Sequence, residues 1–291
     1  MNLFVTKLPN HQISQYLCLM KSTFHGKTAI VTGAGSGIGK SLAEAFALQG
    51  ANVVLAARSG HILEDLAVEL RKTGVEVLVY CCDVSLEENC KELMSQTMAK
   101  FGRIDFLVNN AGISMRELFV NSTPDVLKKL MDVNFWGTVY CTKYALPYLL
   151  EAKGSVTGVS SIAGFKGLPA RTGYSASKFA MQGFLESLRI ENLKTGLHVL
   201  IACPGFTASN IRNAALKGDG SAQGESPRDE ASMMQPEEVA NHILKAIHKR
   251  KKTLILTTQG KLTVLLNKFF PKWMDGKVYE TMAKEPDSPF K

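Results

Sequence analysis

The stretch TAIVTGAGSGIGKSLAEAFALQ, residues 28–49, decides the fold of this chain. It opens with a short apolar and β-branched run, 28–31, which has the length and composition of a buried strand. Glycines then occupy every second position from 33 to 39, and a segment of helical period follows over 40–49. A strand, a glycine-rich turn and a helix in this order bring helical N–H groups towards a pyrophosphate. We therefore predict a dinucleotide site at this turn.

Strand-like and helix-like segments alternate along the rest of the chain. The further strands expected are 52–56, 75–81, 104–108, 155–160, 197–203 and 253–257. The further helices expected are 62–73, 86–100, 123–131, one ending near 152, 174–194 and 236–249. Such alternation predicts the α/β class, with a parallel sheet, helices on both faces and right-handed crossovers.

Composition narrows the class of function. The 291 residues are 45% hydrophobic and 21% charged, which is ordinary for a soluble globular protein. The net charge of +8 is compatible with an anionic partner, but the cations are scattered apart from the run 249–252, so we expect no nucleic-acid partner. Six cysteines without framework spacing predict reduced thiols and a cytoplasmic protein, and six histidines without metal spacing predict no metal.

Both ends of the chain differ from its centre. Residues 1–25 lack the pattern of a signal peptide, and no stretch is apolar for long enough to span a membrane. We expect a poorly ordered extension over 1–25, with Met20 as an alternative start, one catalytic domain over 26–259, and an amphipathic tail over 260–291. The tail either docks on the substrate pocket or another subunit, or lies on a membrane surface. Its apolar residues near helical spacing are Leu262, Leu265, Leu266, Phe269, Phe270 and Trp273, interspersed with Lys261, Lys268 and Lys272.

The segment 154–178 carries the candidate chemistry. Tyr174 and Lys178 are four residues apart, which puts a phenol and an ammonium on one face of a helix. A cation beside a tyrosine favours the phenolate and lowers a pKa that is otherwise about 10. Such a tyrosine can exchange a proton with an alcohol or carbonyl oxygen, which Ser161 could also hydrogen-bond. The alternative is a surface tyrosine and a solvated lysine.

The residues after the second and third strands bear on the cofactor. An acidic side chain after the second strand would bind a ribose 2′-hydroxyl, whereas this chain has Arg58 and Ser59. A guanidinium suits a 2′-phosphate, so we predict NADP in preference to NAD, with a plain surface arginine as the alternative. Asp83 either accepts a hydrogen bond from adenine or caps the helix that follows.

With these parts in place, the chain resembles the short-chain dehydrogenase/reductase family over about residues 25–260. The resemblance rests on Thr-Gly-x-x-x-Gly-Ile-Gly at 32–39, Asn-Asn-Ala-Gly at 109–112, Asn134, Ser161, Tyr174, Lys178 and Pro204-Gly205. It implies a doubly wound, Rossmann-like sheet of seven strands in the order 3-2-1-4-5-6-7. It also implies hydride transfer between NADP(H) and a carbonyl or alcohol, in a homodimer or homotetramer.

The resemblance also implies roles for individual residues. Tyr174 would be the general acid/base, Ser161 would polarise the substrate oxygen, Lys178 would tune the tyrosine and bind ribose, and Asn134 would hold a water. The implied cofactor contacts are Gly33, Ser36, Gly37, Ile38, Gly39, Arg58, Ser59, Asp83, Val84, Asn110, Ala111, Gly112, Tyr174, Lys178, Pro204, Gly205, Thr207 and Ser209.

Two positions depart from the family pattern. Ser209 stands where the family usually has threonine, and its hydroxyl can make the same hydrogen bond. Gly158 stands where a strand residue is usually larger, which points to a close approach of another element.

The substrate is not fixed by these motifs. Apolar residues such as Phe165, Leu168, Phe206, Met233 and Met234 favour an apolar ketone or aldehyde. The alternatives are a membrane-associated lipid or ketosteroid reductase and a cofactor-binding scaffold without turnover. The glycine spacing excludes a sugar epimerase or dehydratase.

Overall fold

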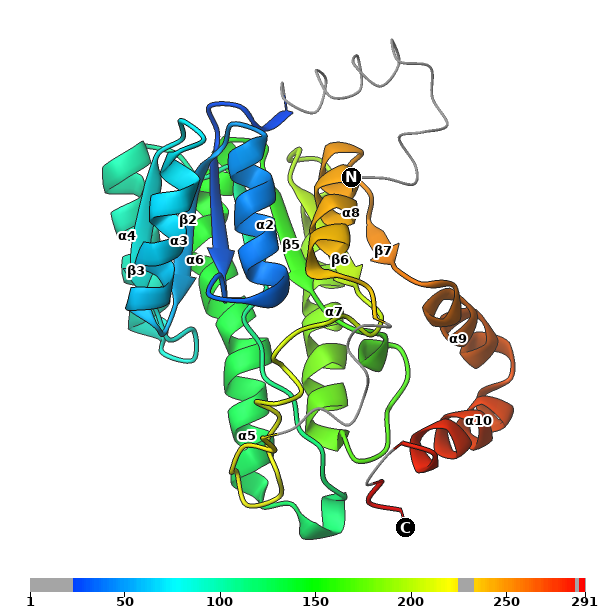
Figure 1. Ribbon diagram of the computed structural model, residues 1–291. Helices are drawn as coiled ribbons and strands as arrows, with labels where there is room; N and C mark the ends of the chain where they lie inside the picture. The colour runs from blue at the N-terminus through cyan, green and yellow to red at the C-terminus, as the bar shows by residue number, and fades with distance from the viewer. Residues whose placement is uncertain (1–22, 225–232, 286–287, 291) are drawn as a thin grey trace.

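The computed structural model describes residues 23–224, 233–285 and 288–290. Its centre is one parallel sheet in the order β3-β2-β1-β4-β5-β6-β7, as predicted (Figure 1). The strands are β1 (Thr28–Thr32), β2 (Asn52–Ala57), β3 (Val77–Cys81), β4 (Phe106–Asn109), β5 (Ser155–Val159), β6 (His198–Cys203) and β7 (Thr253–Ile255). The order reverses between β1 and β4, which pair through Ile30 and Leu107, and ligands of such sheets bind beyond the strand ends at this point.

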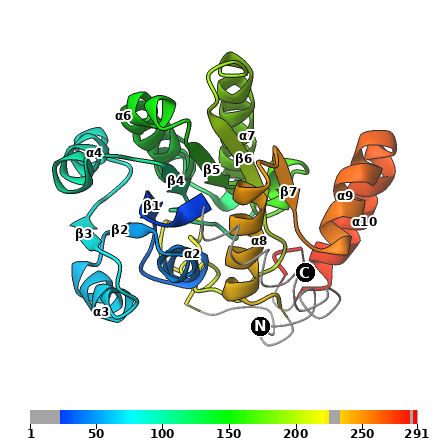
Figure 2. The ribbon, with the colours of Figure 1, turned by 90° about the horizontal axis from the view of Figure 1, so that it is seen from above.

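Helices cover both faces of the sheet (Figure 2). On one face lie α2 (Gly37–Leu48), α3 (Gly60–Arg71) and α8 (Pro236–His248), and on the other lie α4 (Glu87–Phe101), α6 (Gly137–Glu151) and α7 (Thr172–Glu191). Each face has its own apolar core, because every internal strand is buried on both sides. The shorter α5 (Pro124–Met131) packs against α7 and carries part of a third, smaller cluster.

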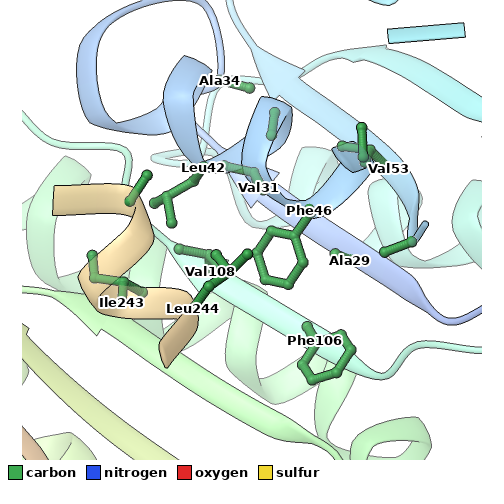
Figure 3. Close-up of a cluster of buried hydrophobic side chains, with 14 of the residues drawn as sticks. Ala29, Val31, Ala34, Leu42, Phe46, Val53, Phe106, Val108, Ile243 and Leu244 are labelled. Carbon is green, nitrogen blue, oxygen red and sulfur yellow. The ribbon is translucent and has the colours of Figure 1, made fainter. Parts of the chain in front are cut away.

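Phe24 belongs to the core although it lies within the predicted extension. Its side chain is fully buried, and its ring lies 5.5 Å from that of Phe46 and 5.2 Å from that of Phe106, centroid to centroid. Figure 3 shows Phe46 and Phe106 among the side chains of the same cluster. The rest of the predicted extension, 1–22, including the alternative start at Met20, lies outside the described residues.

One turn departs from the α-helical pattern. Residues Asp132–Trp136 form a π-helical segment, η3, between α5 and α6, where the sequence predicts a break followed by a second helix. A π turn inserts one extra residue into a helix, and such turns are frequent at functional sites. Asn134, a candidate site residue, is the one fully buried member of this segment.

The C-terminal tail forms two helices, α9 (Thr258–Phe269) and α10 (Pro271–Ala283). Helix α9 is capped by Thr257, whose hydroxyl accepts a hydrogen bond from the Gly260 amide at 3.1 Å, and α10 begins with Pro271, a residue favoured in a first turn. Both lie beyond β7 at the edge of the molecule (Figures 1 and 2). Within the described ranges, no helix is long and apolar enough to cross a membrane.

Candidate active site

The glycine-rich turn between β1 and α2 is closely packed. Gly33 and Gly37 have φ angles of +66° and +51°, in the left-handed region that favours glycine. A Cβ at Gly39 would collide with the carbonyl oxygen of Gly33 and lie 2.5 Å from Nδ2 of Asn110. Ile38 is partly buried against the core, whereas Ser36 precedes the first turn of α2, is exposed, and makes no capping hydrogen bond. The turn thus leaves a helix N-terminus and a hydroxyl open to an anion.

Asn110 and Thr32 fix this turn to the end of β4. The Asn110 side chain donates to the carbonyl oxygen of Thr32 at 2.9 Å and to that of Gly33 at 3.3 Å. The Thr32 hydroxyl accepts from the backbone amides of Asn110 and Ala111, both at 3.0 Å. The family resemblance implies Asn110 as a cofactor contact and does not mark Thr32 as a site residue, although Thr32 opens the glycine motif. Asn110 is thus a structural brace of the turn.

The ends of β2 and β3 bring together the predicted adenosine contacts. Arg58 and Ser59 are exposed, and the charge of Arg58 acts on Asp83. Burial raises the pKa of Asp83, but hydrogen bonds from the Ser85 hydroxyl and amide, at 2.7 and 3.0 Å, together with nearby cations, outweigh it and lower the pKa. The alternative role of Asp83 as a helix cap is wrong, because the N-cap position of α4 is Leu86 and no side chain forms a capping hydrogen bond there.

The segment after β6 connects the glycine turn to a cavity. Pro204 and Gly205 line the cavity, and the buried Thr207 donates from its hydroxyl to the Gly205 carbonyl oxygen at 3.2 Å. A Cβ on Gly37 would lie 3.2 Å from Cβ of Ser209, so this segment reaches the glycine turn at the start of α2. Val84 is buried and packs directly against Gly137, because a Cβ added to Gly137 would lie only 2.7 Å from the Val84 side chain.

Tyr174, Ser161 and Lys178 meet at the ends of β5 and α7. The Ser161 side chain lies close enough to the Tyr174 phenol to act on its pKa, and its hydroxyl accepts a hydrogen bond from the Ala163 amide at 3.2 Å. The Lys178 ammonium is buried, donates to the carbonyl oxygen of Val159 at 2.9 Å, and lies 5.7 Å from the centroid of the Tyr174 ring. The helical spacing read from the sequence therefore places the two side chains together, and β5 adds the serine.

The electrostatics of this group differ from the sequence-based expectation. Burial raises the pKa of Tyr174 above its usual value, and the neighbouring Ser161 hydroxyl and the charge of Arg171 only partly oppose it. The predicted lowering by Lys178 is not found, because its ammonium is itself desolvated and bonded to Val159. Burial lowers the pKa of Lys178 to about 8. At neutral pH the phenol keeps its proton and most of the ammonium remains charged.

Asn134 holds the loop after β4 in place. Its side-chain oxygen accepts from the Ile113 amide at 2.8 Å, and its Nδ2 donates to the Ile113 carbonyl oxygen at 2.9 Å and to the Ser177 hydroxyl at 2.8 Å. Its oxygen and the Lys178 ammonium flank Gly112, since a Cβ there would lie 3.1 and 3.5 Å from them. Asn134 therefore joins the strand-end loop to the helix of Tyr174.

Gln182 and Gly158 also shape this group; the sequence gives no role to Gln182, whereas Gly158 predicts a close approach of another element. Gln182 donates from Nε2 to the Ser160 hydroxyl at 2.9 Å and to the Ser161 carbonyl oxygen at 3.3 Å, which fixes the serine loop to α7. A Cβ at Gly158 would collide with Leu185, so the predicted close approach is that of α7.

A cavity of about 770 Å³ adjoins this group. Ser161 and Ile162 line it on the sheet side, and Phe206, Met233 and Met234 line it on the side of the loop after β6. The remaining wall comes largely from the tail, through Gln259, Gly260, Leu262, Thr263, Leu266, Trp273, Met274, Lys277, Val278, Thr281 and Met282. The tail therefore forms much of the wall of the cavity beside Ser161, and the alternative of a membrane contact stays a prediction. Residues 225–232, which precede Met233 in the chain, lie outside the described ranges.

No group of metal-binding side chains occurs within the ranges that the structure describes.

Comparison with known proteins agrees with this geometry. Residues 27–219 match the short chain dehydrogenase family. The 11-beta-hydroxysteroid dehydrogenase A of Arachis hypogaea is 36% identical over 285 residues, which are 93% of this chain and 80% of the relative. An alcohol dehydrogenase from Thermococcus sibiricus, solved with 5-hydroxy-NADP, is 26% identical with a TM-score of 0.69 and covers 79% of this chain and 95% of its own.

A short chain dehydrogenase/reductase from Burkholderia phymatum, solved with NAD, has the same fold. It is 24% identical with a TM-score of 0.76, and the match covers 86% of this chain and 95% of its own. The chain is therefore a member of the short-chain dehydrogenase family of nucleotide-binding oxidoreductases.

Proposed function

We propose that the protein is an NADP(H)-dependent reductase of an apolar ketone or aldehyde. One observation carries the proposal: Ser161, which lies beside the Tyr174 phenol and acts on its pKa, also lines the cavity, whose walls are mainly apolar. A carbonyl oxygen bound beside Ser161 would meet two hydroxyl groups at once. The 11-beta-hydroxysteroid dehydrogenase named above is compatible with a bulky apolar substrate.

The protonation states favour reduction. Burial raises the pKa of Tyr174, so at neutral pH the phenol holds the proton that a developing alkoxide needs. We infer that Ser161 hydrogen-bonds the same oxygen, that Lys178 supplies positive charge near a ribose, and that Asn134 positions Lys178 or a water. The nicotinamide supplies the hydride. The glycine turn fits a pyrophosphate, because Ser36 is exposed and α2 begins there without a side-chain capping bond, which leaves its first N–H groups free to bind an anion.

The preference for NADP rests on Arg58. It is exposed just after β2 and its charge reaches Asp83, which supports a contact between this guanidinium and a 2′-phosphate. The two solved relatives named above were bound to an NADP derivative and to NAD, so their cofactors do not decide the matter. Hydrogen bonds to charged groups contribute about 1.5–3 kcal/mol, or roughly 10- to 150-fold in affinity.

Steady-state kinetics with both cofactors test the preference. Arg58→Ala is expected to lower kcat/KM for NADPH by roughly 10- to 150-fold and to leave kcat/KM for NADH within about twofold of the wild-type value. The matched control is Lys72→Ala, which removes an exposed cation from the same layer, where it pairs with Glu69. An equal loss for both cofactors, or none, would contradict the role of Arg58.

We further propose a cytoplasmic homodimer or homotetramer. The five described cysteines are free thiols, which suits a reducing compartment. Trp136 and Phe179, on η3 and α7, are 43% and 45% exposed and offer an apolar contact to a second copy. Sedimentation of the wild type and of Phe179→Ser tests this, since a monomeric wild type would contradict it.

A further inference from the structure

The two C-terminal helices carry an exposed apolar surface, here called the tail surface. It is defined by Leu262, Leu265, Phe269, Phe270 and Trp273, each of which is more than half exposed. Leu262, Leu265 and Phe269 follow a 3–4 residue spacing on α9, which places them on one face of that helix, and Phe270 and Trp273 continue the surface at the start of α10. An apolar surface of this kind normally marks a contact with a membrane or another protein.

The tail surface is held in place by the body of the protein. Lys166, in the loop before α7, forms an ion pair with Asp275 of α10. Asn267 of α9 donates to the carbonyl oxygen of Phe165 at 3.2 Å. Glu285, at the end of the tail, is buried and pairs with Arg171 at 3.3 Å. The apolar side chains therefore point outward from anchored helices.

The charges around the tail surface are unbalanced. Lys261, Lys268 and Lys272 are exposed on α9 and α10, and none of them has an ion-pair partner among the described residues. The acidic residues of the same helices are engaged, Asp275 with Lys166 and Glu280 with Lys277. Two copies of this surface placed face to face would bring like charges together. An anionic lipid bilayer would instead bury the apolar side chains and attract the three lysines by its negative charge.

The cavity meets the tail surface. Leu262 and Trp273 line the cavity and are also 52% and 53% exposed, so its rim reaches the protein surface at these side chains. The tail surface and the mainly apolar interior of the cavity are therefore continuous at these two side chains. A ligand with low solubility in water could pass between them without crossing open solvent.

We propose that the tail surface docks on the headgroup layer of an anionic lipid bilayer, from which an apolar substrate enters the cavity. The turn at Phe269 and Phe270 lies in the headgroup layer, and the three unpaired lysines contact anionic lipids. The docking itself does not depend on the proposed reductase activity. The route for substrate rests on that activity.

Vesicle flotation without substrate tests the docking. The probes are phosphatidylcholine vesicles with and without about 30% phosphatidylglycerol, at low salt and at about 0.5 M salt. Wild-type protein is expected to float with the anionic vesicles. The floated fraction should fall at least about fivefold in Phe269→Ser/Phe270→Ser, neither of which lines the cavity. The control Leu48→Ser/Leu86→Ser removes two exposed leucines far from the tail and should float like the wild type.

The lysines are tested separately. Lys261→Gln/Lys268→Gln/Lys272→Gln should lose the preference for anionic vesicles and its dependence on salt. Turnover of a water-soluble ketone should be unchanged in the phenylalanine variant, which separates docking from catalysis. Absence of the wild type from floated vesicles, or equal flotation of the phenylalanine variant, would overturn the proposal. Loss of a dimer in that variant, without vesicle binding by the wild type, would assign the surface to a second copy instead.

Discussion

The packing of Gly39 predicts a selective defect in cofactor binding. A Cβ there would collide with the Gly33 carbonyl oxygen, and this backbone atom cannot rotate away as a side chain can. The same Cβ would displace Nδ2 of Asn110, which donates to Thr32 at 2.9 Å. Overpacking at such a position costs about 1–3 kcal/mol. If the turn adapts by opening, most of that cost falls on the bound state and weakens NADPH binding roughly 5- to 150-fold.

The assay is calorimetric titration of NADPH into Gly39→Ala, with circular dichroism to verify folding. Gly60 provides the matched control, because a Cβ there meets no atom within 4 Å and its φ is not in the left-handed region. Gly60→Ala should keep its affinity within about twofold and gain up to about 1 kcal/mol from helix propensity. Equal affinities for the two variants would refute the inference that this turn holds the cofactor.

Three further predictions concern stability and geometry. Phe24→Ala removes a fully buried ring and should lower the free energy of unfolding by about 3–5 kcal/mol in urea titration; a loss below about 1 kcal/mol would mean that this segment is not part of the core. Burial lowers the pKa of His198, so unfolding takes up a proton as the pH falls below about 6.5; stability should decline there, less steeply in His198→Gln, and an equal slope would contradict this. Gln182→Leu removes two hydrogen bonds that hold the Ser160–Ser161 loop and should lower kcat by about tenfold at an unchanged KM for NADPH; a change confined to KM would exclude a positioning role.

Much of the fold was predictable because local and global signals agree. Apolar runs of strand length alternate with helical segments, and glycine, proline and polar residues mark most boundaries. The predicted strand order is confirmed. Some boundaries shifted: the strand predicted over 253–257 is Thr253–Ile255, since Thr257 adopts a φ of +66° to cap α9.

The geometry of the candidate site was only partly predictable. Spacing placed Tyr174 and Lys178 on one helix face, but the pKa of Tyr174 depends on burial by segments distant in sequence and on where the ammonium finds its acceptor. The π turn around Asn134 leaves no periodic signal in a single sequence. The Gln182 contacts arise only when α7 packs across the ends of β5 and β6, so no spacing rule could find them.

The structure of the tail was also only partly predictable from the sequence. Its helical spacing was visible, but the division at Phe270 and Pro271 into two helices that wall a cavity depends on contacts with the loop before α7. Phe24 lies outside any periodic pattern and is nevertheless buried between Phe46 and Phe106.

The most direct test of the proposed function is the turnover of apolar ketones and aldehydes by the wild type and Tyr174→Phe, with NADPH and NADH compared. The account predicts turnover selective for NADPH in the wild type and a loss of at least about 100-fold in kcat for the variant, with NADPH affinity kept within about twofold. Undiminished turnover in Tyr174→Phe would contradict the role of the tyrosine as proton donor. Tight NADPH binding by a wild type that turns over none of these substrates would favour a cofactor-binding scaffold instead.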